Sequence, residues 1–294
     1  MNRQVAKKIK FLPLLLTLML VWGCHSTKTE KDGITVSIEP IKYFVDQLTS
    51  EQVEVNVMVP MGSSPATYAP TTRQLVKLSD SRLYVGIGHL GFEQAWMGKI
   101  TDLNPEMKVL YLAEGIDPIV SIGENHGDHI HEGGIDPHIW MSPKVVKTFL
   151  PVLKEHLLKY FPEQKAIIEK QYVILLNKVS DMDDQYAVMA DSLSQKTFMI
   201  FHPALSYLAR DYGFEQLSIE HEGKEPSPRQ LQELIEMGKE HNVRLIFIQA
   251  EFDRRNAEMV KEAIGAELVS INPLSYDWFN NLSELKQLMQ NHLK

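Results

Sequence analysis

The sequence predicts an α/β protein in which two similar lobes, each built on a parallel sheet, are joined by one long rigid helix. Short apolar runs alternate with helix-length segments in the first part of the chain and again in the last part, and this order favours parallel sheets. Between these two regions, residues 143–194 read as helix throughout. The chain has 294 residues, of which 44% are hydrophobic, so it is long enough for two domains and can bury a core.

Residues 1–23 are expected to be a lipoprotein signal peptide. The first ten residues are basic, and Phe11 to Trp22 is an apolar run of 12 residues, which is too short to cross a bilayer. Gly23 then precedes Cys24, the one cysteine of the chain, and the polar residues 24–33 follow as a flexible tether. This arrangement resembles the lipobox of bacterial lipoproteins, in which Cys24 would become the acylated N-terminus.

The N-terminal lobe is expected over residues 34–161. Helix-length segments such as Thr71–Ser81 separate its strands, and a helix over Pro143–Phe161 ends it. Glu124–Gly134 is rich in glycine and charge, which indicates a mobile loop. The predicted strands are Ile34–Glu39, Val53–Val59, Arg82–Gly88 and Lys108–Leu112.

The connecting helix is expected over residues 162–194 and the C-terminal lobe over residues 195–294. Pro162 suits the first turn of a helix, and a continuous helix of this length would span roughly 45 Å at 1.5 Å per residue. The strands predicted after it are Thr197–Phe201, Gln216–Glu220, Val243–Gln249 and Glu267–Ile271. The helices predicted between and after these strands are Ala204–Tyr212, Ser227–Asn242, Arg254–Ile264 and Leu282–His292.

The composition argues against nucleic acid as a partner and limits the chemistry of any metal site. Without residues 1–23 the chain has 26 Lys and Arg against 38 Asp and Glu, whereas phosphate binding needs clustered Lys and Arg. If Cys24 is acylated, the folded part has no thiol, which excludes disulfides and thiolate ligands. A metal site must then use His, Asp and Glu.

Polar side chains follow several of the predicted strands. In open parallel sheets, ligands bind outside the carboxyl ends of the strands. His89 and His202 come directly after two predicted strands, and Glu251 follows a third. Two histidines in such positions indicate a cleft that is built for a metal or an anion, although a single one would more often be a capping or hydrogen-bonded residue.

Four short motifs give the chain a specific resemblance. Together with a segment over residues 59–70 and a His-rich loop before the first motif, they resemble the zinc/manganese-binding lipoproteins of bacterial ABC importers over essentially all of residues 34–294. The resemblance implies two α/β lobes with a metal site in the cleft between them. The motifs are Asp136-Pro137-His138-Ile139-Trp140, Phe201-His202-Pro203-Ala204, Glu225-Pro226-Ser227-Pro228 and Asn272-Pro273-Leu274.

The resemblance implies His138 and His202 as metal ligands. The family usually has a histidine where this chain has Ala66 and an aspartate where it has Asn272. Two imidazoles seldom hold zinc tightly, because zinc sites take three or four protein ligands. His89 is therefore the expected replacement for the missing histidine.

Two further groups are candidate ligands. Glu251 could supply an oxygen, and its alternative role is to cap the helix that follows. His126, His129 and His131 lie close together in the loop and suit weak, exchangeable metal capture. Their alternative is a merely solvated loop.

The expected function is binding rather than catalysis. The resemblance implies an exported receptor, anchored by lipid and monomeric, that binds a divalent ion and delivers it to the membrane permease of an ABC importer. Imidazole ligation favours Zn²⁺, with Mn²⁺ or Fe²⁺ as alternatives. A rival hypothesis keeps the fold but replaces the bare ion with a metal chelate or a small organic ligand. A weaker rival is a metal-dependent hydrolase that uses His89, His138 and His202, with Glu93 or Glu251 as its base.

Overall fold

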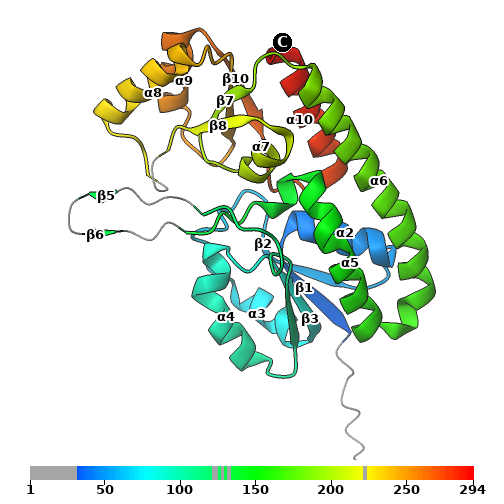
Figure 1. Ribbon diagram of the computed structural model, residues 1–294. Helices are drawn as coiled ribbons and strands as arrows, with labels where there is room; N and C mark the ends of the chain where they lie inside the picture. Colours follow the sequence, from blue (N-terminus) through cyan, green and yellow to red (C-terminus); the bar gives the residue numbers. More distant parts are fainter. Residues whose placement is uncertain (1–31, 121–124, 127–128, 131–133, 221–223) are drawn as a thin grey trace, which may run out of the picture. The chain divides into compact units, whose positions relative to one another are not determined.

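Two four-stranded parallel sheets organise the chain (Figure 1), which confirms the predicted fold class. The computed structural model describes residues 32–120, 125–126, 129–130, 134–220 and 224–294. The N-terminal sheet has the order β2-β1-β3-β4, formed by β1 (Gly33–Ile38), β2 (Val55–Val59), β3 (Ser81–Gly86) and β4 (Lys108–Tyr111). The C-terminal sheet has the order β10-β9-β7-β8, formed by β7 (Thr197–Ile200), β8 (Glu215–Ser218), β9 (Leu245–Gln249) and β10 (Glu267–Ile271).

Several helices begin at side chains that cap them. Thr71 and Gln74 form a reciprocal capping box at the start of α3 (Thr72–Ser79), and Ser227 and Gln230 form another at α8 (Pro228–Glu240). Ser142 caps α5, whose first residue is a proline. The remaining helices of the two lobes are α2 (Glu39–Thr49), α4 (Gly91–Leu103), α5 (Pro143–Tyr160), α7 (Ser206–Tyr212), α9 (Arg255–Ile264) and α10 (Trp278–His292).

One long helix packs against helices of both lobes. A single 3₁₀ turn, η2 (Pro162–Gln164), leads into α6 (Lys165–Ser192), whose 28 residues correspond to about 42 Å. This helix contacts α2 and α5 of the N-terminal lobe and also α10, and it can be followed in green along the side of Figure 1. None of the helices in the described ranges is long and apolar enough to cross a membrane.

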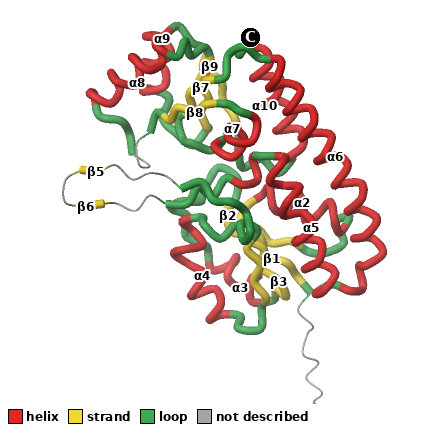
Figure 2. The backbone as a smooth tube through the Cα atoms, in the orientation of Figure 1, coloured by secondary structure: helices red, strands yellow, loops and turns green. Residues whose placement is uncertain are grey.

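Alternation along the strands places apolar side chains on both faces of the C-terminal sheet. Leu245 and Phe247 of β9 join the large core that runs through both lobes, whereas Ile246 and Ile248 point into a smaller core with α8 and α9. Successive strand residues face opposite sides, so a sheet covered by helices on both faces needs a continuous apolar run. Figure 2 shows the strands of this sheet between helices.

A cluster of three residues, which we call the tryptophan clasp, joins the two lobes. Trp140 lies in the 3₁₀ turn η1 (Ile139–Met141) and donates its indole N–H to the carbonyl of Pro273, which follows β10, at 2.8 Å. Trp278 at the start of α10 donates its own indole N–H to the carbonyl of Trp140 at 2.7 Å. Both indoles are 1% exposed. Helix α10 begins four residues earlier than predicted because Asp277 accepts a hydrogen bond from the backbone N–H of Asn280 and caps it.

Glu93 holds the turn between β3 and α4. Its carboxylate accepts backbone N–H groups from Ile87 at 2.8 Å, Gly88 at 2.6 Å and Leu90 at 3.2 Å, together with the hydroxyl of Ser37. The residue is 2% exposed. Burial raises the pKa of Glu93, and the hydrogen bonds from Ser37 and the backbone oppose this without cancelling it.

The tryptophan clasp predicts that replacing Trp278 lowers the stability of the protein more than replacing Trp96 does. Trp278→Phe should lower the free energy of unfolding by about 1–3 kcal/mol, because the buried carbonyl of Trp140 loses its donor. Trp96→Phe is the control: the Trp96 ring packs against the edge of the core, is partly exposed and lies against Lys99, so the change should cost less than Trp278→Phe. Urea denaturation of both variants checks this, and equal losses would contradict the role of the clasp.

The raised pKa of Glu93 predicts a pH dependence of stability. The native state binds this proton more tightly than the unfolded state, so the contribution of Glu93 is complete below about pH 4.3 and is lost as the pH rises through its native pKa. The stability difference between the wild type and Glu93→Gln should therefore shrink with rising pH, by at most about 1.4 kcal/mol per unit. Denaturation curves between pH 4 and 7 measure it, with Glu114→Gln as the control for loss of an exposed carboxylate. Parallel curves for the wild type and Glu93→Gln would contradict the prediction.

Candidate metal site

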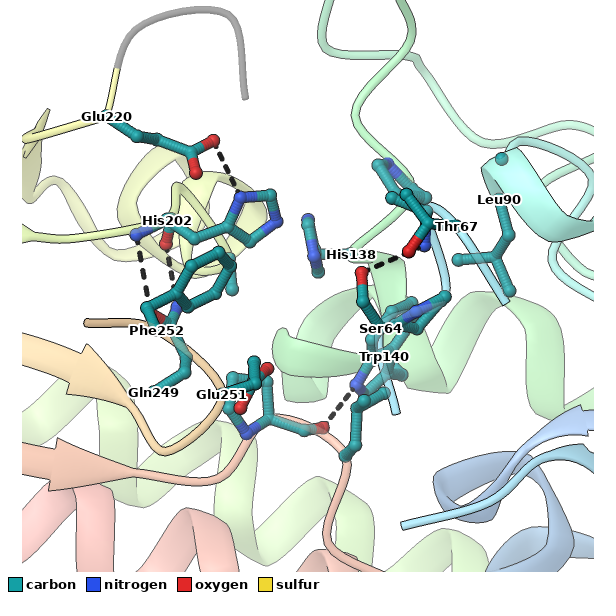
Figure 3. Close-up of a pocket in the computed structure, with 17 residues that line it drawn as sticks. Ser64, Thr67, Leu90, His138, Trp140, His202, Glu220, Gln249, Glu251 and Phe252 are labelled. Carbon is teal, nitrogen blue, oxygen red and sulfur yellow. Dashed lines mark hydrogen bonds and ion pairs between the residues drawn. The ribbon is translucent and has the colours of Figure 1, made fainter. Parts of the chain in front are cut away.

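A cavity of about 410 Å³ lies between the two lobes (Figure 3). The N-terminal lobe contributes the loop after β2 and the first residues of α4, and the C-terminal lobe contributes the segments that follow β7, β9 and β10. Both histidines implied by the motifs line it. The residues that line it include Ser64, Pro65, Ala66, Thr67, Leu90, Gly91, Pro137, His138, Trp140, His202, Glu220, Gln249, Glu251, Phe252, Pro273 and Leu274.

His138 is oriented by its own motif. The carboxylate of Asp136 accepts the backbone N–H of His138 at 2.8 Å and lies 2.9 Å from its ring Nδ1. Burial alone would raise the pKa of Asp136, but the charge and hydrogen bonds of His138, with a further bond from Ser206, hold it below its usual value. An ionised carboxylate accepts hydrogen bonds only. Asp136 therefore selects the tautomer that carries its proton on Nδ1, with the lone pair on Nε2.

His202 is oriented by residues from two other segments, one after β8 and one at the end of β9. Glu220, beyond the end of β8 and 9% exposed, places a carboxylate oxygen 2.7 Å from its Nδ1. The side-chain amide of Gln249 donates to the carbonyl of His202 at 2.8 Å and accepts its backbone N–H at 3.3 Å. Phe252 stacks on the imidazole with ring centroids 5.4 Å apart. Both the backbone and the ring plane of His202 are therefore fixed.

The two imidazoles form a matched pair. Their ring centroids are 5.1 Å apart with an interplanar angle of 71°, and the rings lie next to each other in the middle of Figure 3. Each uses Nδ1 on a buried carboxylate, which is the arrangement that most metal-binding histidines adopt because it fixes the tautomer and increases the basicity of the ligand. The pair can coordinate one ion through two Nε2 atoms.

Of the other residues discussed from the sequence, Glu251 and Ala66 line the cavity and Asn272 does not. Glu251 lines the cavity and is exposed, so it is within the site. Ala66 also lines it, with a methyl group that offers no donor. Asn272 is absent from the lining, and its side-chain oxygen accepts the backbone N–H of Leu274 at 3.1 Å.

His89 does not line the cavity, so the structure does not bring together the three imidazoles expected from the sequence. Gly88 has a φ of +108° and turns the chain, and Gly91 then approaches Ala66 so closely that a Cβ would lie 2.6 Å from its carbonyl oxygen. As a result, Leu90 and Gly91 face the cavity. Among the residues that the structure describes, no group of three His, Cys, Asp or Glu side chains is arranged to hold an ion.

Glu93, one of the two bases considered for a hydrolase, is already engaged in hydrogen bonds. Glu93 is buried and its two oxygens accept the four hydrogen bonds described above, and it is not among the residues that line the cavity. It acts as a structural cap rather than as a group that could take a proton from a water molecule.

Part of the predicted site lies outside the described residues. Cys24 and His131 belong to this part. The short strands β5 (Asn125–His126) and β6 (His129–Ile130) pair antiparallel, with His126 opposite His129, and their side chains are not described. The capture role of this loop therefore stays a prediction.

Sequence reasoning did not identify Glu220, Gln249 and Phe252 as parts of the site. The first two carry a signal that was available: both lie at or just beyond the carboxyl end of a predicted strand, where ligand sites form. Phe252 carries no such signal, because its stacking on His202 depends on how the turn after β9 folds.

The chain is similar to proteins of known family. Residues 34–291 match the family described as zinc-uptake complex component A, periplasmic (ZnuA). A zinc-binding lipoprotein AdcA of Streptococcus pneumoniae is 28% identical over 284 residues, which cover 91% of this chain and 55% of that protein. The high-affinity zinc uptake system protein ZnuA of Bacillus subtilis is 26% identical over 86% of this chain and 81% of its own length.

Solved structures show the same likeness in three dimensions. A crystal structure of ZnuA superposes with a TM-score of 0.82 at 34% identity and covers 90% of this chain and 99% of that one. A zinc-bound deletion mutant of ZnuA gives 0.81 at 35% identity, with coverage of 90% and 98%. The chain nevertheless spans only about half the length of its pneumococcal relatives.

Proposed function

Because the chain belongs to the ZnuA family of periplasmic zinc-uptake components, we propose that it is an extracytoplasmic receptor that binds zinc and delivers it to the permease of an ABC importer. The family comprises substrate-binding receptors for metal uptake rather than enzymes. His138 and His202 would bind the ion, and Glu251 would add an oxygen from the C-terminal lobe.

The paired carboxylates are the observation that carries this proposal. Asp136 and Glu220 both contact the Nδ1 atom of a histidine, and burying two carboxylates is costly unless they are hydrogen-bonded. An ion at the two Nε2 atoms would gain ligands that are already held in the required tautomer. Two histidines with only a structural role would need neither a buried carboxylate at each Nδ1 nor a cavity between the lobes.

Zinc is the cargo favoured by the donor set. Neutral imidazole suits zinc, whereas Mn²⁺ prefers more oxygen ligands. The pneumococcal relative is a zinc-binding lipoprotein, and the Bacillus relative is a protein of a high-affinity zinc uptake system. Mn²⁺ or Fe²⁺ would be the alternative if Glu251 and water supplied most of the remaining ligands.

The proposed location is outside the cytoplasmic membrane, with Cys24 acylated and residues 24–33 as the tether. The name lipoprotein of the pneumococcal relative supports this arrangement. The permease and the lipid bilayer would be the partners of a monomeric receptor.

The histidine pair predicts a graded effect of mutation on zinc affinity. His138→Ala and His202→Ala should each lower it by more than the roughly 10–100-fold that loss of a hydrogen-bonding partner of a ligand costs. Asp136→Asn and Glu220→Gln should fall within that range. Zinc titration against a competing chelator measures all four.

Two histidines outside the cavity serve as controls. His156 is bonded to the carbonyl of Val152 on α5, and His89 does not line the cavity, so alanine at either position should leave the affinity unchanged. A large loss in His89→Ala would restore it as a third ligand. Unchanged affinity in both His138→Ala and His202→Ala would overturn the proposed function.

The proposed anchor predicts that Cys24→Ala releases the protein from membranes. A single acyl chain binds a bilayer only marginally whereas several anchor it firmly, and the variant cannot carry any on this residue. Fractionation of washed membranes checks this, with the wild type retained as the control. A variant that stays in the membrane fraction would contradict it.

A further inference from the structure

The cavity beside the two imidazoles is much larger than one ion needs. Its volume of about 410 Å³ falls in the range of sites for small organic molecules. The walls around the histidines are mainly apolar, with Leu90, Trp140 and Phe252 among them. A site for a bare, hydrated ion has no need of such walls.

The donor set is also too small for the ion that the histidines suit. Zinc takes four ligands in protein sites and keeps at least three from the protein even when one position is open. His138 and His202 supply two, and Glu251 is the one other cavity residue with an uncommitted carboxylate in the described ranges. At Ala66 the wall has a methyl group in place of a donor.

Together these observations describe a cavity with room for an organic molecule and with coordination positions left for it to fill. We propose that the protein binds zinc as a complex with a small bidentate chelator, an α-amino acid, whose amine nitrogen and carboxylate oxygen complete the coordination begun by His138 and His202. The side chain of the amino acid would lie against Leu90, Trp140 and Phe252. This inference rests on the proposed zinc function and specifies the form in which the cargo arrives.

The chelator would occupy the space next to Ala66. A larger side chain at this position would take the same space and so prevent the chelator from binding. Pro65 accepts the backbone N–H of Phe92 at 2.8 Å, and Gly91 packs against Ala66, so the backbone of this loop is held against the start of α4. A larger side chain at position 66 would therefore occupy the cavity. This allows the chelator to be blocked without altering either histidine.

The test uses L-histidine as the probe and holds free zinc at a fixed, buffered concentration, because free histidine also binds zinc. Under this condition the amino acid should raise zinc occupancy, with a coupling in the range of about 5–150-fold. By linkage, zinc should tighten the binding of histidine by the same factor. Native mass spectrometry should show one protein with one zinc ion and one histidine, and N-acetyl-L-histidine, which keeps the carboxylate and the imidazole but has no free amine, should not reproduce the effect.

Two substitutions at position 66 distinguish the effect of filling the cavity from the effect of adding a metal ligand. Ala66→Leu fills the cavity without adding a donor, so it should lose the enhancement by histidine. Ala66→His adds an imidazole, so it should raise the affinity for zinc alone and also lose the enhancement. His156→Ala, on the surface of α5, should behave as the wild type.

The outcomes distinguish this inference from the function on which it rests. Tight binding of zinc alone, with no ternary complex and no effect of histidine at fixed free zinc, would overturn the chelate proposal and leave the receptor function standing. An enhancement that survives Ala66→Leu would place the amino acid elsewhere and overturn it as well. Absence of zinc binding both with and without histidine would instead remove the proposed function itself.

Discussion

The two indole hydrogen bonds of the tryptophan clasp are the constraint on which the rest of the structure depends. Trp140 donates to the carbonyl of Pro273 while its own carbonyl accepts from Trp278, so one residue of the N-terminal lobe is bonded twice to the segment that follows β10. Inside the core, an unpaired indole N–H or carbonyl would be costly. The two bonds therefore help to fix the relative position of the lobes, together with the bond from the hydroxyl of Tyr276 to Asp46.

The tryptophan clasp and the metal site share one short segment of the chain. Trp140 lies two residues after His138, and Asp136 lies two residues before it. The carbonyl of Asp136 accepts the hydroxyl of Tyr207 from α7 at 3.0 Å. Fixing Trp140 and Asp136 leaves His138 little freedom, so one short segment both joins the lobes and presents a ligand. The Asn272-Pro273-Leu274 motif also helps to join the lobes. The side-chain oxygen of Asn272 accepts the backbone N–H of Leu274, and the carbonyl of Pro273 accepts the indole N–H of Trp140.

The electrostatics of the site follow from this rigidity. Asp136 and Glu220 are buried, where an ionised carboxylate is stable only with strong hydrogen-bond donors. The imidazoles supply these donors at Nδ1, so the Nε2 atoms are the ones that can bind an ion in the cavity. A cation placed there meets two neutral donors backed by two negative charges. The opposite wall, with Ala66 and Leu90, supplies space rather than ligands.

The sequence by itself determined the features that depend on residues close together in the chain. Alternating apolar runs specify the two parallel sheets, Thr71 and Ser227 specify helix starts, and the Asp-Pro-His spacing brings Asp136 to the ring of a residue only two positions away. Only the tertiary structure decided the pairing of His202 with Glu220, 18 residues apart, and of Trp140 with Pro273, 133 residues apart. It also decided that Leu90 rather than His89 faces the cavity. The strand-end rule places both residues at the correct edge of the sheet, but the direction of a side chain there depends on the turn at Gly88 and on the packing of Gly91 against Ala66, which are contacts between segments that the chain brings together only when it folds.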